Sequence, residues 1–127
     1  MHLYNRESAN KLLPSLRQLL EEIVEKRREL TAIQRQLHSR HMHPVDQLLA
    51  DEDGRLSRRF EQLDEELFAL IQQVQKTGAV VKDLEMGLID FPAVVDRQPV
   101  YLCWKLGEDD IRFYHGVEEG FYGRKPL

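Results

Sequence analysis

The side chains best suited to chemistry are three carboxylates and one imidazole in the last third of the chain, namely Asp83, Glu85, Asp90 and His115. Carboxylate oxygens bind hard divalent cations, and an imidazole nitrogen adds affinity for borderline cations. A carboxylate and an imidazole can also act as a general acid and base. Asp83 and Glu85 are two residues apart, so in a strand both side chains leave the same face. This pattern predicts a candidate site for a divalent metal or for acid–base chemistry.

The same residues have a structural interpretation, which is the commoner case for such a pattern. Asp90 precedes Phe91-Pro92 and can cap a bend there, while the other carboxylates can pair with Lys105 or Arg112. The two interpretations differ in whether the four side chains converge on one pocket that solvent reaches.

Two further polar groups lie between the predicted helices. His38, His41 and His43 have the spacing i, i+3, i+5, so two of them could bind zinc or nickel if a helix continued through His41. They are otherwise polar turn residues.

The second group is the acidic triplet Asp51, Glu52 and Asp53. In outline it is similar to the acidic coiled-coil tip of transcript-cleavage factors, which predicts, as a minor alternative, an RNA polymerase- or ribosome-associated factor. The simpler interpretation is that the triplet favours the start of the next helix through the helix dipole.

The single cysteine, Cys103, excludes a disulfide framework and a cysteine-based zinc cluster. We expect it on the strand face that carries Tyr101 and Lys105, where no histidine is expected, so nucleophilic catalysis by its thiol is not predicted. The chain has no glycine-rich phosphate loop, nucleophile elbow or His-Glu-x-x-His zinc helix. No specific reaction is therefore indicated, and enzymatic activity is not the leading prediction.

The secondary structure that must position these residues is predicted to change at Gly78, from helices before it to strands after it. The apolar spacing before it predicts long helices over 14–38 and 55–77, packed as an antiparallel hairpin with a kink near Pro14 and a tip at 38–54. Lys26 lies on the apolar seam and is expected either to snorkel or to meet a carboxylate across the interface. The seam consists of Ala9, Leu12, Leu16, Leu19, Ile23, Leu30, Ile33 and Leu37. Three more apolar residues, Leu13, Leu20 and Val24, widen it and predict a homodimer.

The second part, 78–127, holds six of the seven glycines and predicts a small antiparallel β-meander. We expect an extended segment at 79–84, a bend at 87–93, and strands at 100–106 and 111–115 joined by a four-residue loop. That loop would place His115 opposite Leu102, on the face away from Cys103. The predicted fold is α+β, a coiled-coil-like helical hairpin over 1–77 followed by the meander, as one folding unit.

Composition narrows the class of protein. The chain has 127 residues and a formal charge of −4, which makes a nucleic-acid partner unexpected. There is no apolar run of about 18 residues and no signal-peptide pattern at the start, so no membrane association is predicted and a cytoplasmic location is expected.

Four segments resemble a bacterial family catalogued as domain of unknown function 2203. They are the stretches 82–93 and 100–108, the opening 7–14 and the closing 120–127. The resemblance covers nearly the whole chain but implies no activity, cofactor or catalytic residue. The leading prediction is a non-enzymatic cytosolic interaction or regulatory protein. We expect it to form a homodimer and to bind another protein. The alternative is a small metal-binding protein or metal-dependent enzyme. No cofactor is established beyond a possible divalent metal.

Overall fold

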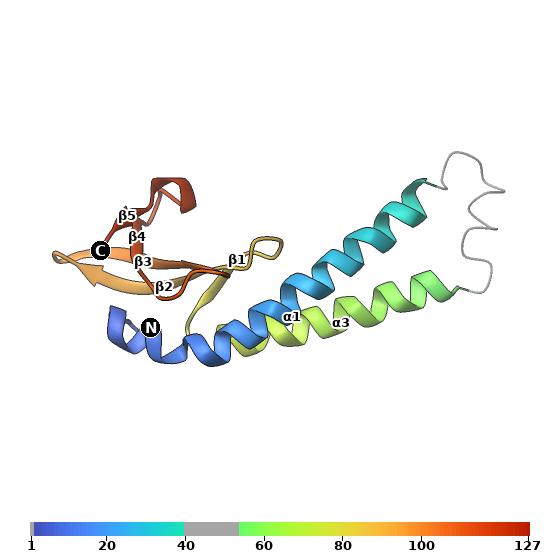
Figure 1. Cartoon of the computed structure of the whole chain (residues 1–127), viewed down its shortest axis with the longest axis horizontal. Coiled ribbons are helices and arrows are strands. Elements are labelled where there is room, and N and C mark those ends of the chain that lie inside the picture. Colours follow the sequence, from blue (N-terminus) through green and yellow to red (C-terminus); the bar gives the residue numbers. More distant parts are fainter. Residues whose placement is uncertain (1, 40–53) are drawn as a thin grey trace.

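The computed structural model describes residues 2–39 and 54–127 and contains two long helices followed by one five-stranded sheet (Figure 1). Helix α1 (Arg6–Ser39) and helix α3 (Arg55–Lys76) run antiparallel. The sheet lies at one end of this hairpin, next to the first turns of α1, and the other end extends beyond it. The α+β class and the helical hairpin are confirmed.

Helix α1 begins with a reciprocal cap. The Asn5 Oδ1 atom accepts a hydrogen bond from the Ser8 backbone N–H at 2.8 Å, and the Asn5 N–H donates to Ser8 Oγ at 3.0 Å. Both bonds satisfy groups that a helix start leaves unpaired. The helix then continues through Pro14 as one element, so the chain is not divided there into a short and a long piece.

The two helices pack through apolar residues and two ion pairs. On α3 the buried residues are Leu63, Leu67, Leu70 and Val74. Lys26 meets Glu66 across the interface with an Nζ–Oε2 distance of 2.8 Å, the second of the two arrangements expected for it. Arg59 donates to both carboxylate oxygens of Glu29, at 2.8 and 3.0 Å. Charged pairs at these positions favour one register of the two helices.

The residues that widen the seam are already covered within the chain. Leu13 and Leu20 are buried in the common core, and Val24 is half-buried. Helix α1 thus faces α3 and the sheet at once. These residues therefore do not supply the spare apolar surface from which the homodimer was predicted.

The sheet is an antiparallel meander in which each strand pairs with the next along the chain. Its strands are β1 (Val80–Asp83), β2 (Leu88–Val95), β3 (Gln98–Lys105), β4 (Phe113–Gly116) and β5 (Lys125–Pro126), with a 3₁₀ turn, η1 (Phe121–Gly123), before β5. The expected meander is confirmed.

The bend expected at 87–93 is wrong, because this segment forms most of strand β2. Proline lacks the N–H that a central strand needs. Pro92 is tolerated because its backbone faces away from β3, where its carbonyl accepts a hydrogen bond from the Tyr4 N–H at 2.7 Å. Strand β1 pairs with β2 only over Leu88–Asp90, so Pro92 sits on an edge of the sheet.

The register between β3 and β4 differs by one residue from the expected one. Cys103 pairs with Phe113 and Tyr101 pairs with His115, whereas Leu102 pairs with Tyr114 and not with His115. Side chains alternate along a strand, so a slip of one residue transfers His115 to the opposite face. It joins the face of Cys103, and Trp104 and Leu102 remain on the face toward the core.

Among the described residues, neither helix contains an apolar stretch of the length that a membrane crossing requires.

Candidate metal-binding site

Three polar side chains meet on the sheet face that points away from the helices. Asp90 on β2 and Cys103 on β3 are direct cross-strand partners, and His115 on β4 lies diagonally from Cys103. One ligand atom from each of the three lies within 4.8 Å of the other two. All three residues are buried, with exposed fractions of 1%, 0% and 3%.

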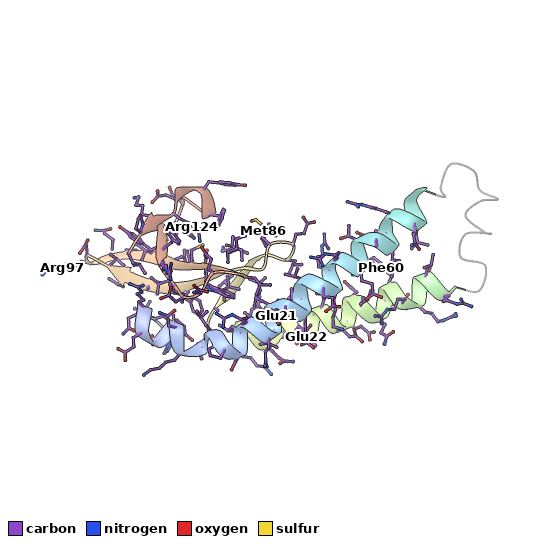
Figure 2. All side chains as sticks on the ribbon, viewed as in Figure 1. Glu21, Glu22, Phe60, Met86, Arg97 and Arg124 are labelled. Carbon is purple, nitrogen blue, oxygen red and sulfur yellow. The ribbon has the colours of Figure 1, made fainter. Side chains whose placement is uncertain are left out.

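The C-terminal segment closes this face. Arg124 donates from Nη1 to both carboxylate oxygens of Glu108, at 3.0 and 3.1 Å. Its guanidinium carbon also lies 4.2 Å from the ring centroid of Phe113 and 4.3 Å from that of Phe121. Figure 2 shows Arg124 on the C-terminal segment, beside the sheet. The sheet face that carries Cys103 is therefore covered by a stacked, ion-paired arginine.

Both ring nitrogens of His115 have a hydrogen-bond partner. Nδ1 lies 2.8 Å from the carbonyl oxygen of Gly116, and because a carbonyl only accepts, Nδ1 is the donor in this contact. Nε2 lies 2.9 Å from Asp90 Oδ2. The buried imidazole is therefore held in one orientation from both sides.

The other oxygen of Asp90 is buried without a hydrogen-bond partner of ordinary geometry, and the thiol of Cys103, a weak donor, is the polar group that Asp90 meets besides His115. Buried polar atoms without a partner are rare and costly, and each calls for an explanation. Here the free oxygen belongs to a carboxylate that already lies beside an imidazole nitrogen and a thiol. A bound cation would satisfy it.

The thiol of Cys103 is held in its neutral form. Burial, followed by the negative charge of Asp90, raises its pKa to about 12, and Arg124 opposes this only in part. A thiol with this pKa is not a nucleophile at neutral pH. It becomes a thiolate only if a cation replaces its proton.

The structure brings together two of the four residues predicted as a site, Asp90 and His115. Asp83 and Glu85 do not join them, because Asp83 ends strand β1 and Glu85 lies in the turn that follows. There Asp83 Oδ1 accepts from the N–H groups of Glu85 and Met86, both at 2.8 Å, and Glu85 is exposed. The alternative role of Asp90 as the cap of a bend is also wrong, since it lies within β2.

Cys103 is the residue that sequence reasoning missed. It was placed on a face without a histidine because the register of β4 was displaced by one residue. The signal that could have found it is the spacing Asp90, Cys103 and His115 on three successive strands of a meander, but only with the right register.

The remaining predicted residues are not tested. His41, His43 and the acidic triplet Asp51, Glu52 and Asp53 lie outside the described residues. His38 lies in the last turn of α1, and its side chain is not among those described.

The donor set fits zinc or a similar borderline cation better than magnesium or calcium, because it includes sulfur and nitrogen. One thiolate and one carboxylate would balance a divalent charge, so the occupied site would be neutral. The bond from His115 Nδ1 to the Gly116 carbonyl is the support that orients a ligating imidazole.

A tetrahedral ion keeps its ligand atoms roughly 3.3–3.8 Å apart. The contact between Nε2 of His115 and Oδ2 of Asp90, now 2.9 Å, would therefore have to widen slightly. The three ligand atoms now lie within 4.8 Å of one another, so the thiol sulfur would have to move toward the ion.

Comparison with known proteins identifies the family of the chain but indicates no activity for it. The sequence model of a family described as "Uncharacterized conserved protein (DUF2203)" matches residues 2–127. No curated protein and no solved structure matches the chain.

Proposed function

Since the chain belongs to the DUF2203 family, which is described only as uncharacterised, we propose a function from its own geometry. The protein is a metal-binding protein of the cytoplasm that holds one zinc-like divalent ion with Asp90, Cys103 and His115. The observation that carries this proposal is the buried, unpartnered oxygen of Asp90 beside a thiol and an oriented imidazole.

The ion has a structural or regulatory role in this proposal. Its three ligands are almost fully buried, so a substrate would not reach it. Three protein ligands leave one position of a tetrahedral ion for a water molecule, and metal binding that links strands in this way contributes to folding. The three ligands come from three neighbouring strands, β2, β3 and β4. Occupancy would therefore tie the centre of the sheet together. A reducing cytoplasm would keep the Cys103 thiol free to bind.

Metal content and cobalt substitution test the proposal. Protein purified without chelator should contain about one zinc per chain. After removal of that zinc, added Co²⁺ should give the near-ultraviolet thiolate charge-transfer band and the intense visible bands of tetrahedral cobalt. A Cys103→Ala variant should lose the thiolate band, and an Asp90→Asn variant should bind more weakly by about tenfold or more.

The controls separate lost ligands from lost folding. Glu85→Gln removes a carboxylate from the same half of the chain but outside the buried cluster, and should leave metal binding unchanged. Circular dichroism of each variant without metal shows whether it folds. The proposal is wrong if the folded wild type binds neither zinc nor cobalt, or if Cys103→Ala keeps the thiolate band.

We also propose that the protein acts through its helical hairpin, first of all by pairing with a second copy of the chain. What supports this is a hollow of about 370 Å³ beside Phe68, a side chain that is 63% exposed on α3. Most of its lining is apolar, and three charged residues border it; the other lining residues are Leu30, Leu67, Ile71 and Leu84, with Arg27, Asp64 and Glu65. An exposed phenylalanine next to an apolar depression is typical of a contact surface.

Sedimentation measures this second proposal directly. The wild type should sediment as a dimer at micromolar concentration and Phe68→Ser as a monomer. Val117→Ser is the matched control, because Val117 is similarly exposed but lies at the sheet end of the molecule. A monomeric wild type would remove the homodimer. An RNA polymerase- or ribosome-associated role through the acidic triplet stays a separate prediction.

A further inference from the structure

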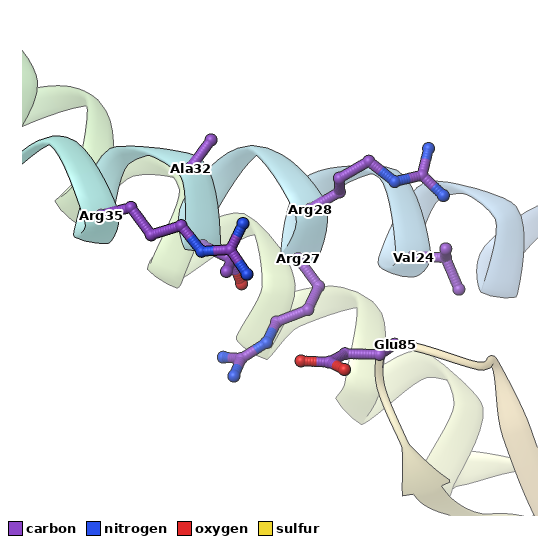
Figure 3. Close-up of a pocket in the computed structure, with 7 residues that line it drawn as sticks. Val24, Arg27, Arg28, Ala32, Arg35 and Glu85 are labelled. Atoms are coloured by element: carbon purple, nitrogen blue, oxygen red, sulfur yellow. The ribbon is translucent and has the colours of Figure 1, made fainter.

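A second hollow, of about 290 Å³, lies between helix α1 and the turn that joins β1 to β2. Three arginines of α1, Arg27, Arg28 and Arg35, line it together with Thr31, Val24 and the turn residue Glu85. Figure 3 shows Arg35 extending back along the helix toward Arg27, and Arg27 facing Glu85. We call this the arginine hollow.

The arginine hollow has a net positive charge. Three guanidinium groups stand against one carboxylate, in a chain whose formal charge is −4. No ion pair between described residues involves Arg27, Arg28 or Arg35 within 4 Å. Elsewhere on the same hairpin, by contrast, Lys26 is paired with Glu66 and Arg59 with Glu29.

Arg27 also has a polar atom without a partner. Its Nε is buried from solvent and makes no hydrogen bond. An N–H that is shielded from water and has no acceptor costs free energy, so its presence at the wall of a hollow indicates a missing acceptor. Arg27 lines this hollow and also the hollow beside Phe68, and an oxyanion in the arginine hollow that drew the Arg27 side chain toward it would provide the acceptor.

We infer that the arginine hollow binds a small multivalent oxyanion, carried on a phosphorylated or a polycarboxylic small molecule. Guanidinium groups match the oxygens of phosphate and carboxylate in two-point contacts. The Thr31 hydroxyl adds a donor, and Val24 gives an apolar wall for the body of the ligand. Glu85 opposes a bare anion and so limits the affinity for it. This site is separate from the metal ligands and goes beyond the proposed function.

Calorimetric titration of the full chain with inorganic pyrophosphate and with citrate tests the inference. At least one of them should bind with a stoichiometry near one. Binding of pyrophosphate alone identifies phosphate as the ligand chemistry, and binding of citrate alone identifies carboxylate. Arg27→Ala and Arg35→Ala should each weaken binding by about tenfold, the usual effect of losing a charged hydrogen bond.

Two more variants make the test specific. Glu85→Gln should strengthen anion binding several-fold, because it removes the one opposing charge and preserves the shape. Arg97→Gly removes a guanidinium at the far end of the sheet and should leave binding unchanged, since Arg97 lies in the β2–β3 turn (Figure 2). The inference is overturned if neither anion binds to the folded wild type, if Arg97→Gly weakens binding as much as Arg27→Ala, or if Glu85→Gln weakens it.

Discussion

At the scale of single residues, burial makes Cys103 a thiol that keeps its proton in ordinary buffers. Its neighbours explain this, because the site removes water and places the Asp90 carboxyl beside the sulfur. The pKa of about 12 lies well above that of a cysteine in an unfolded chain, about 8.5. The same residue in its two environments thus differs in how tightly it holds a proton.

This difference predicts that metal-free protein loses stability in alkaline solution. Below pH 8 the thiol is protonated in both states and contributes no pH dependence. Between about pH 9 and 12 the unfolded chain releases the proton and the folded chain keeps it, so the free energy of unfolding falls by up to about 1.4 kcal/mol per pH unit. Urea unfolding from pH 8 to pH 11 measures this fall.

Other groups also titrate between pH 9 and 12. The part of the stability loss that is due to Cys103 is therefore measured by comparing the wild type with Cys103→Ala. At pH 8 the variant should be less stable because it leaves a small cavity, but it should lose less additional stability as the pH rises. Equal pH slopes for the two proteins would contradict the assignment of this effect to Cys103.

At the scale of elements, the turn between β2 and β3 carries two residues in left-handed conformations. Asp96 has φ 52° and Arg97 has φ 66°. A two-residue hairpin of this kind favours Asn-Gly, because side chains other than those of Asn, Asp and Gly are strained there. The double change Asp96→Asn and Arg97→Gly should raise the free energy of unfolding by about 1 kcal/mol. Chemical denaturation measures it, and Arg97→Ala, which keeps the strained Cβ, should bring no such gain.

Local pattern was enough to predict several elements. The span of α3 and a carboxylate opposite Lys26, one of the two arrangements expected for it, follow from helical spacing, which is encoded within a few turns. For the same reason the fold class was predictable. Asp90 and His115 were recognised by residue type alone.

The register that completes the site was not predictable, because distant contacts determine it. We expected a four-residue loop at 107–110, but the connection between β3 and β4 is 106–112. In it, the Ile111 N–H does not pair with a strand and instead donates to Asn10 Oδ1 on helix α1. Within the connection, the Glu108 side chain accepts from the Lys105 N–H and its carbonyl accepts from Trp104 Nε1. No local turn rule includes a partner a hundred residues away.

At the scale of the whole molecule, one buried cluster runs from the helices into the sheet. It contains Leu16 and Ile23 from α1, Leu67 from α3, and Phe91 and Trp104 from the sheet. Because these side chains share one core, removal of either part exposes the apolar surface of the other. The hairpin and the meander should therefore unfold together.

Trp104 allows this to be measured, since it is the only tryptophan and is fully buried. Its fluorescence reports on the sheet, and far-ultraviolet circular dichroism reports mainly on the helices. The two signals should follow one transition with the same midpoint in urea. Two separated midpoints would show that the parts fold independently.

Tyr4, near the start of the sequence, covers part of an edge of strand β2. It forms a parallel bridge to Ala93, and its hydroxyl donates to the carbonyl oxygen of Thr77, so it fastens the start of the chain across the end of β2 that β1 does not reach. An uncovered strand end is a template on which other chains can grow as fibres. Together with Pro92, which lacks an N–H for a new partner, Tyr4 blocks that growth. We therefore expect a chain without these first residues to assemble into fibres more readily than the full chain.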